Sequence, residues 1–116
     1  MTEDPDPADI FATLDDKYAR DILVATKTDR LSAKELSNKC DMSRPTVSRR
    51  VSRLVEQGLL EEYTHVDPGG RHYSEYEARL ERIEVLLQAE GFDIQIDVRP
   101  DPADRITSIF EEMRGD

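Results

Sequence analysis

The chain is poor in the residues that build large cores and disulfides. Its 116 residues include no tryptophan, three phenylalanines, four tyrosines and one cysteine, Cys40. A single cysteine cannot form a disulfide within the chain, so we expect a reducing, cytoplasmic environment. This length predicts one domain with a modest core, to which a partner chain could add buried surface.

Long hydrophobic runs are absent from the sequence as well. No apolar stretch approaches the roughly 20 residues of a membrane-spanning helix. The N-terminus, MTEDPDPADI, is acidic and lacks the apolar region of a signal peptide. We therefore expect no membrane association, and we expect residues 1–8, with two prolines among acids, to be disordered.

Residues that carry catalysis or bind metals are also few. The chain has two histidines, His65 and His72, no nucleophile beside a base and no glycine-rich phosphate loop. We expect no enzyme activity, no cofactor and no metal site. The histidines are interpreted as structural or exposed, the alternative being a response to pH or metal. Cys40 is interpreted as a small buried residue at a turn, the alternative being a redox sensor.

Negative charge is abundant but uneven. The chain has 26 acidic and 16 basic residues, of which only four are lysines, and a formal net charge of −10. Such surfaces are typical of proteins from halophiles that accumulate salt; ordinary acidity is the alternative. Residues 31–73 carry six acids and seven bases, whereas residues 1–30 and 74–116 have net charges of −4 and −7. The middle segment alone suits contact with a polyanion such as DNA.

That middle segment begins with LSAKELSNKCDMSRPTVSRRVSRLVEQG, which predicts two short helices joined by a tight turn. Ser32 and the glutamate three residues later form a capping box at the start of the first helix. Ser43 caps the second helix, Pro45 is tolerated in its first turn, and Gly58 ends it.

The second helix, residues 44–57, has two distinct faces. With Val47 at zero on a helical wheel of 100° per residue, Val51 and Leu54 lie within about 40° and predict a buried stripe. Arg49 lies at about 200° on that wheel and therefore points outward. A helix with a buried aliphatic stripe and outward arginines is suited to lie against nucleic acid.

The flanking elements complete a recognisable order. Before the pair, apolar residues at steps of three and four predict one helix over Ala8–Thr26. After it, Leu60–Val66 predicts a strand, Asp67-Pro68-Gly69-Gly70 a turn, and a second strand begins at Arg71. Helix, turn, arginine-bearing helix and β-hairpin is the order of a winged helix-turn-helix, an α+β fold. The stripe of the first helix consists of Ile10, Phe11, Leu14, Tyr18, Ile22 and Ala25.

The remaining residues, 77–116, form an extension that we expect to mediate dimerisation. Strict alternation of apolar residues favours a second β-hairpin over residues 82–98, although the spacing also allows a dimerisation helix over residues 75–90. Asp101 and Pro102 then start an amphipathic helix over residues 102–114. Its apolar stripe, which we favour as a dimer interface over a contact with its own domain, consists of Ile106, Ile109, Phe110 and Met113.

Residues 10–76 resemble winged-helix transcription regulators of the ArsR type. The resemblance rests on LDDKYARDIL, on the two-helix segment, on the Leu54–Leu60 segment and on the following wing, EEYTHVDPGGRHY. The chain looks like the small helix-turn-helix regulators abundant in haloarchaea. The resemblance implies that residues 9–76 form a DNA-binding domain. Metal sensing does not carry over, because the metal-sensing members have paired cysteines and this chain has only Cys40.

The arginines of residues 44–57 are the main candidate contacts to double-stranded DNA. Arg49 and Arg53 can each present a guanidinium fork to guanine O6 and N7, the commonest specific base contact. Arg44 and Arg50 are expected at backbone phosphates, where they position the domain. The alternative is a solvated helix face paired with nearby acids.

Three further residues are candidates for the same interface. Thr46 and Ser48 lie near the helix N-terminus, where free N–H groups favour anions, although capping and solvation are the alternative. Arg71 follows the wing turn and is expected to enter the minor groove, the alternative being a surface charge at a strand edge.

The sequence therefore predicts a dimeric, sequence-specific transcription regulator. Residues 44–57 would lie in the major groove, and residues 60–73 would form the wing. The alternative is a winged-helix module that binds proteins in a transcription complex and does not read DNA. The sequence does not identify a small-molecule effector.

Overall fold

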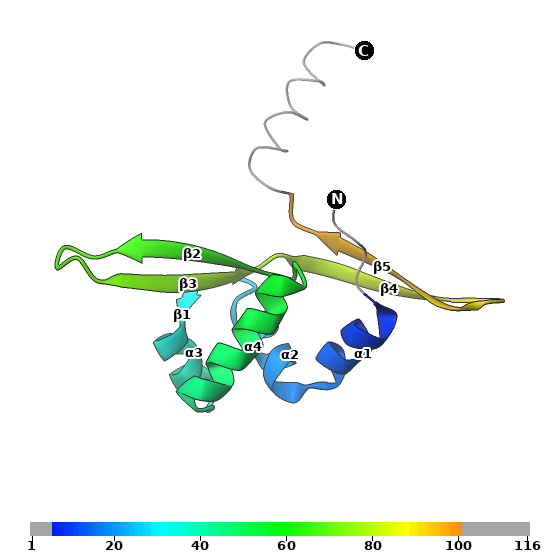
Figure 1. Cartoon of the computed structure of the whole chain (residues 1–116), viewed down its shortest axis with the longest axis horizontal. Coiled ribbons are helices and arrows are strands. Elements are labelled where there is room, and N and C mark those ends of the chain that lie inside the picture. Colours follow the sequence, from blue (N-terminus) through cyan, green and yellow to red (C-terminus); the bar gives the residue numbers. More distant parts are fainter. Residues whose placement is uncertain (1–5, 101–116) are drawn as a thin grey trace, which may run out of the picture.

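The computed structural model describes residues 6–100, in which four helices lie on one side of two β-hairpins (Figure 1). The two hairpins leave the centre of the molecule in opposite directions. The fold class is α+β, as predicted, and none of the described helices is long and apolar enough to cross a membrane. The elements, in chain order, are α1 (Pro7–Asp15), α2 (Lys17–Ala25), β1 (Leu31–Ser32), α3 (Ala33–Lys39), α4 (Arg44–Glu56), β2 (Leu60–Val66), β3 (His72–Ala78), β4 (Leu80–Gln88) and β5 (Gly91–Val98).

The single helix predicted over residues 8–26 is two helices, because the chain breaks at Asp16. This residue ends α1 and is the N-cap of α2, with φ −80° and ψ 113°. Its carboxylate accepts hydrogen bonds from the backbone N–H groups of Tyr18 and Ala19 at 2.9 and 3.4 Å. An aspartate satisfies free N–H groups at a helix start better than it stabilises a helix interior. The apolar period alone therefore overestimated the length of the helix.

The start of α1 also differs from expectation. It begins at Pro7, within the segment predicted to be disordered, because the Asp6 carboxylate accepts the Ala8 N–H at 2.9 Å and proline fits the first helical turn. Residues 1–5 lie outside the described residues. The predicted C-terminal helix, residues 102–114, lies outside them as well.

The helix-turn-helix forms with the caps that the sequence predicts. Ser32 Oγ accepts the Glu35 N–H at 3.2 Å, and the Glu35 carboxylate accepts the Ser32 N–H at 3.0 Å, which closes the capping box. Ser43 Oγ accepts an N–H from the first turn of α4 at 3.2 Å. Gly58 follows α4 with φ +77°, and Asp41 in the turn has φ +52°, a left-handed conformation that aspartate tolerates better than most residues.

The core lies where α4 meets the other helices and the base of the wing. Val47, Val51 and Leu54 are buried, as the helical wheel predicts. Phe11 and Tyr18, which the single-helix pattern placed in the core, are 39% and 42% exposed, because the break between α1 and α2 redirects the apolar stripe. The other buried core residues include Ile10, Ala19, Ile22, Leu31, Leu36, Met42, Leu59 and Leu60.

The wing is part of a three-stranded sheet in the order β1-β3-β2. β2 has the predicted bounds and pairs with β3 in antiparallel register along its whole length. β3 begins at His72, one residue later than expected. β1 pairs with β3 through Leu31 opposite Tyr76 and Ser32 opposite Glu75. Because Ser32 also caps α3, backbone pairing joins the helix-turn-helix directly to the wing.

Residues 80–98 form the second hairpin, so the strand interpretation of this region is confirmed and the helix over residues 75–90 is wrong. The hairpin begins two residues earlier than predicted, with an irregular register between Leu80 and Arg82. Its apolar residues face one another across the strands in the pairs Ile83–Ile96, Val85–Ile94 and Leu87–Phe92. One face of this hairpin is therefore apolar along its length.

Candidate nucleic-acid interface

The outward side of α4 carries Arg49. Its side chain is exposed, as is that of Ser48 beside it. Within residues 6–100, no hydrogen bond or ion pair engages the Arg49 guanidinium. All of its donors are available to a ligand that approaches this side of the helix.

Arg50, the next residue, is partly buried and paired within the protein. Its Nε donates to Asp16 Oδ2 at 2.5 Å, and its guanidinium carbon lies 5.6 Å from the centre of the Tyr18 ring. Burial alone would raise the pKa of the Asp16 carboxyl, but the hydrogen bonds from Arg50 and from the N-terminal N–H groups of α2 outweigh it. The pKa is therefore lowered. This pair joins α4 to the junction of α1 and α2.

Two further candidates on α4 also contact the protein. Arg53 is partly exposed, and its Nη2 donates to the Asp9 carbonyl at a long 3.4 Å. The Thr46 hydroxyl accepts a 2.8 Å hydrogen bond from Ser43 Oγ, so it belongs to the cap of the helix. The outward arginine face of the sequence prediction thus divides into a free Arg49 and neighbours that also contact the protein.

The tip of the wing is organised by Asp67. Its backbone N–H donates to the Arg71 carbonyl, and its Oδ1 accepts the N–H groups of Gly69 and Arg71, each at 2.9 Å. Gly70 has φ +83°, a conformation that favours glycine. These bonds fix the backbone of Arg71 while its side chain remains exposed.

A groove of about 620 Å³ lies between the wing and the starts of α3 and α4. Lys34 from α3, Arg44 from α4 and Arg71 from the wing tip line it, with His72 beside them. None of its lining residues carries a carboxylate. We call it the basic groove; an extended anion such as a phosphodiester strand is the ligand that its charge favours. The remaining lining residues are Ser32, Ala33, Thr64, Tyr73, Ser74 and Tyr76.

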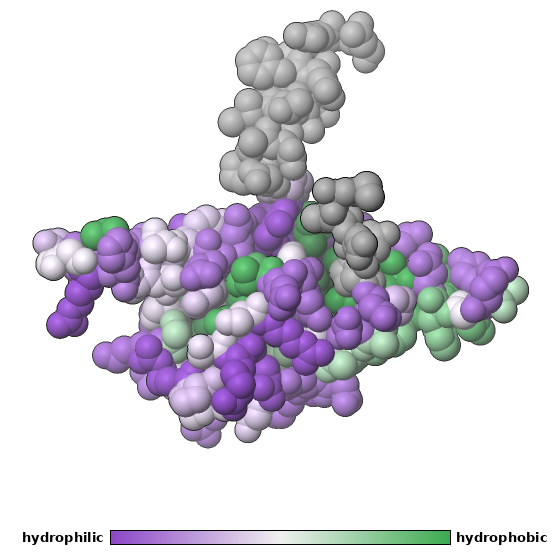
Figure 2. Space-filling model, viewed as in Figure 1, coloured by the Kyte–Doolittle hydropathy of each residue, from purple (hydrophilic) through white to green (hydrophobic). Residues whose placement is uncertain are grey.

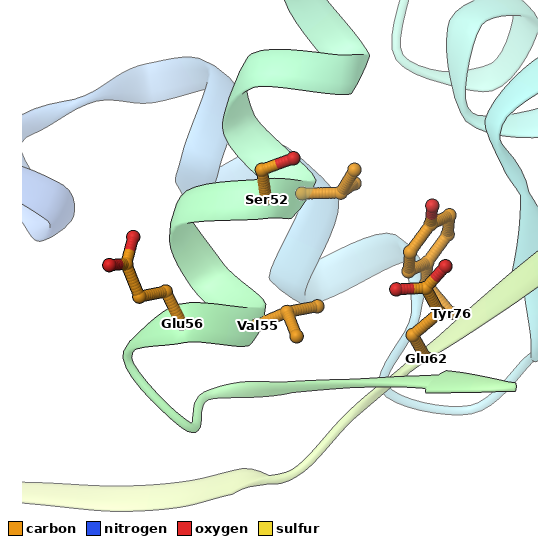
Figure 3. A pocket seen from close by; sticks show the side chains of 6 residues that line it. Ser52, Val55, Glu56, Glu62 and Tyr76 are labelled. Carbon is orange, nitrogen blue, oxygen red and sulfur yellow. The ribbon is translucent and has the colours of Figure 1, made fainter.

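A smaller groove of about 250 Å³ lies further along α4 (Figure 3). Val55 points from the helix toward Glu62 and Tyr76, and Glu56 follows it as the last residue of the helix. The Glu62 carboxylate accepts a 2.6 Å hydrogen bond from Ser74. Two carboxylates line this groove and none lines the basic groove. Along α4, the surface beside the wing therefore changes from positive near the N-terminus to negative near the C-terminus.

The opposite face of the wing is occupied by ion pairs. Arg99, directly after β5, lies 2.5 Å from a Glu77 oxygen and 3.0 Å from a Glu61 oxygen. It also donates to the Tyr63 hydroxyl at 3.3 Å. The Arg30 guanidinium lies 3.6 Å from the centre of the Tyr63 ring, within cation–π range. Arg99 thus joins the second hairpin to the wing.

The two histidines and the cysteine do not lie together in one site. His65 Nε2 is 2.8 Å from a Glu75 oxygen, and its ring stacks on Tyr73. Cys40 is partly buried, and burial together with Asp21 raises the pKa of its thiol, which keeps the sulfur protonated. Within residues 6–100, no three histidine, cysteine or acidic side chains gather where they could hold a metal ion.

Sequence reasoning missed two residues that shape this interface. Lys34 lines the basic groove, and its place in the first turn of α3, just after the Ser32 cap, was a usable signal. Asp16 had no such signal, because its partner Arg50 is 34 residues away and only the tertiary fold brings them together.

Comparison with known families matches the central part of the chain. Residues 14–63 match the family model of a helix-turn-helix domain, a span that contains α2, α3, α4 and the start of β2. No match to a curated protein was found. The matched span ends before β3, so the second hairpin lies outside it. Residues 14–63 are therefore similar to a helix-turn-helix domain.

Proposed function

We propose that the protein is a sequence-specific, DNA-binding transcription regulator. The N-terminal half of α4 enters the major groove, and one phosphodiester strand lies in the basic groove. The observation that carries this proposal is the convergence of Lys34, Arg44 and Arg71 from three elements on a groove without carboxylates, in a chain of net charge −10. Helix-turn-helix domains bind DNA by placing their second helix in the major groove.

The roles of the individual residues follow from their contacts. Arg49, free and outward, contacts a base, with Ser48 beside it. Arg53 exchanges its long contact with Asp9 for a second DNA contact. Arg50, which we expected at a phosphate, acts as a positioning residue, because Asp16 already binds its guanidinium.

Residues near the two ends of α4 set the tilt of the DNA. Thr46 and Arg44 lie at the end beside the basic groove, and a phosphate near this N-terminus gains from the helix dipole. Glu56 and Glu62 lie near the other end and repel phosphates. The duplex therefore crosses the N-terminal half of the helix.

We further propose a homodimer that reads two half-sites about one helical turn apart. The predicted stripe Ile106, Ile109, Phe110 and Met113, which lies outside the described residues, is the proposed contact between the two copies. The acidic, lysine-poor composition supports a protein of haloarchaeal type that works in high salt. Unfolding midpoints that rise with molar KCl support this adaptation, and midpoints that fall contradict it.

The proposed function is tested by selection from a random duplex library with the purified full chain. The expected result is enrichment of a two-fold symmetric site, because a dimer presents the same surface twice. Titration of the enriched duplex then compares the wild type with Arg49→Ala. Loss of a base contact of this kind weakens specific binding by about 1–3 kcal/mol.

Arg82→Ala is the matched control. Arg82 is an exposed arginine of the second hairpin, paired with Glu84, and its loss should leave the affinity unchanged. A selection that enriches no duplex refutes the proposed function. Equal affinity of the wild type and Arg49→Ala refutes the assigned base contact.

A further inference from the structure

Exposed hydrophobic side chains gather at the free end of the second hairpin. Leu87 and Phe92, opposite each other beside the turn, are 76% and 58% exposed, and Val85 is 45% exposed. Phe11 on α1 meets Phe92 edge-on, with ring centroids 6.1 Å apart. We call these four residues the tip patch. Figure 2 shows hydrophobic surface along this hairpin beside the mostly hydrophilic surface of the rest of the view.

The hairpin that carries the tip patch is covered mainly at its base. Ile83, Ile94 and Ile96 are partly buried against the core, whereas the tip patch is open to solvent within residues 6–100. A two-stranded hairpin is marginally stable in water unless its apolar face packs on something. Contiguous exposed apolar residues on a soluble protein mark an interaction surface. The tip patch therefore requires an occupant.

The chain itself contains a segment of matching chemistry. Residues 102–114 carry the stripe Ile106, Ile109, Phe110 and Met113 at helical spacing. As a helix, these residues would measure about 20 Å. The strand β5, from its base to the tip, measures about 26 Å. The segment is thus long enough to cover the exposed part of the hairpin, and both surfaces are uncharged.

The route of the chain out of the hairpin favours a partner molecule as the source of this segment. Arg99 is fixed at the base of the hairpin, where its backbone N–H donates to the Arg79 carbonyl at 2.7 Å and its side chain binds the wing carboxylates. Pro100 and Pro102 follow it, and a proline disfavours helical conformation in the residue before it. The two prolines favour an extended exit over a sharp reversal toward the tip of the same hairpin.

We propose that residues 102–114 of a second copy of the chain cover the tip patch. The exchange is reciprocal, so two tip patches and two C-terminal segments are buried about one two-fold axis. This inference rests on the homodimer of the proposed function and names the surface that the C-terminal stripe meets. Because the two hairpins point in opposite directions, the dimer leaves α4 and the basic groove open (Figure 1).

The first test measures dimer dissociation of full-length variants by sedimentation equilibrium. Leu87→Glu should weaken the dimer about tenfold or more, since a buried leucine is lost and a charge enters an apolar contact. Val24→Glu is the control, because Val24 on α2 is also 76% exposed but lies outside the tip patch. Ile109→Glu should weaken the dimer as strongly, and the double variant should add little. A monomeric wild type, or an unchanged Leu87→Glu dimer, overturns the proposal.

The second test identifies which molecule supplies the segment. In a Cys40→Ser background, Leu87→Cys and Ile109→Cys are combined and oxidised. A disulfide between two chains, seen as a dimer on a non-reducing gel, supports the proposal. A disulfide closed within one chain means that each molecule covers its own tip patch, and this result overturns it. Absence of any disulfide between the two positions overturns it as well.

Failure of this inference is separable from failure of the proposed function. A monomeric wild type that still binds the selected duplex refutes the exchange alone. A dimer that loosens with Leu87→Glu but binds no duplex refutes the DNA function alone.

Discussion

The two hairpins have the same local architecture and opposite surface chemistry. The wing, β2–β3, is bordered on its helix side by the basic groove and on its outer side by paired charges. The second hairpin, β4–β5, has an apolar face whose outer half is exposed. The wing begins inside the helix-turn-helix match, and the second hairpin lies outside it.

This difference shows how one fold separates two kinds of contact. Alternation along a strand places every second side chain on the same face, so a change of residue type on that face changes the partner without changing the backbone. On the wing, the face toward the helices carries mostly polar residues, with Arg71 at the tip and Glu62 nearer the base. On the second hairpin, the corresponding positions are aliphatic or aromatic. We accordingly propose nucleic acid for the first hairpin and a second copy of the chain for the other.

The largest expected effect is a difference in how much the two hairpins contribute to the free energy of unfolding. Leu60 at the base of the wing is 2% exposed, so Leu60→Ala should lower the free energy of unfolding by about 3 kcal/mol through lost burial and a cavity. Leu87→Ala, at the tip of the other hairpin, should cost less than about 0.5 kcal/mol in the monomer. Urea unfolding of dilute protein measures both. Equal losses would mean that the second hairpin is as much part of the core as the wing.

The next prediction tests whether the contact of α4 with the junction of α1 and α2 stabilises the fold. Asp16→Ala removes a helix cap and the partner of Arg50, and should lower the free energy of unfolding by about 2 kcal/mol at neutral pH. Asp15→Ala, an exposed neighbour at the end of α1, is the control. An unfolding free energy that Asp16→Ala leaves unchanged would mean that the Asp16–Arg50 pair does not stabilise the fold.

The Asp16 carboxylate also predicts a pH dependence. Its pKa in the folded state lies below the ordinary value of 3.8, so the unfolded state binds the proton more tightly. The stabilisation is therefore complete above pH 3.8 and is lost as the pH falls through the folded-state pKa. The difference in unfolding free energy between the wild type and Asp16→Ala should shrink over that acidic range. A difference that stays constant would mean that the cap and the ion pair contribute no charge-dependent stability.

A smaller effect is expected at the junction of the two hairpins. Arg99→Gln breaks the ion pairs with Glu61 and Glu77, which are partly shielded from water, and should cost about 1–2 kcal/mol. Glu77→Gln should cost less when Arg99 is already replaced, because the two side chains contact each other. Chemical denaturation of the two single variants and the double variant measures this coupling. Additive losses would show that the hairpins are not joined through Arg99.

The smallest expected effect compares a basic residue of the basic groove with a basic residue of the second hairpin in DNA binding. Lys34→Ala should weaken DNA binding modestly on every sequence and reduce the slope of log affinity against log salt by about 1, as expected for one lost phosphate contact. Arg82→Ala should leave the slope unchanged. Salt titrations with the selected and a scrambled duplex measure both slopes. Equal changes would mean that the basic groove has no special role in phosphate contact.

Much of this arrangement could be predicted from the sequence, because the decisive signals are local. The Val47, Val51 and Leu54 stripe, the Ser32 capping box and the turn glycines act within a few residues of themselves. Strict alternation in residues 82–98 likewise favoured a hairpin. These features depend on helical and strand periods, which a single sequence contains.

The rest could not be predicted, because it depends on partners far apart in the chain. The apolar spacing of three and four residues predicted one helix that continues through Asp16. In the structure, Asp16 instead caps a second helix. Sequence spacing likewise predicted that Arg50 contacts a DNA phosphate, although Asp16 binds its guanidinium in the folded protein. The basic groove combines three elements, and only the register of β1 on β3 brings Lys34 opposite the wing.

That register has a consequence for recognition. The two residues of β1 link the start of α3 to β3 by backbone pairing, so both walls of the basic groove belong to one rigid unit before any ligand arrives. A wing of this kind loses little conformational entropy when it meets a duplex, in contrast to a loop that must be ordered. The width of the basic groove is therefore fixed as well. DNA whose backbone does not fit that width must deform, and the free energy of this deformation depends on the DNA sequence.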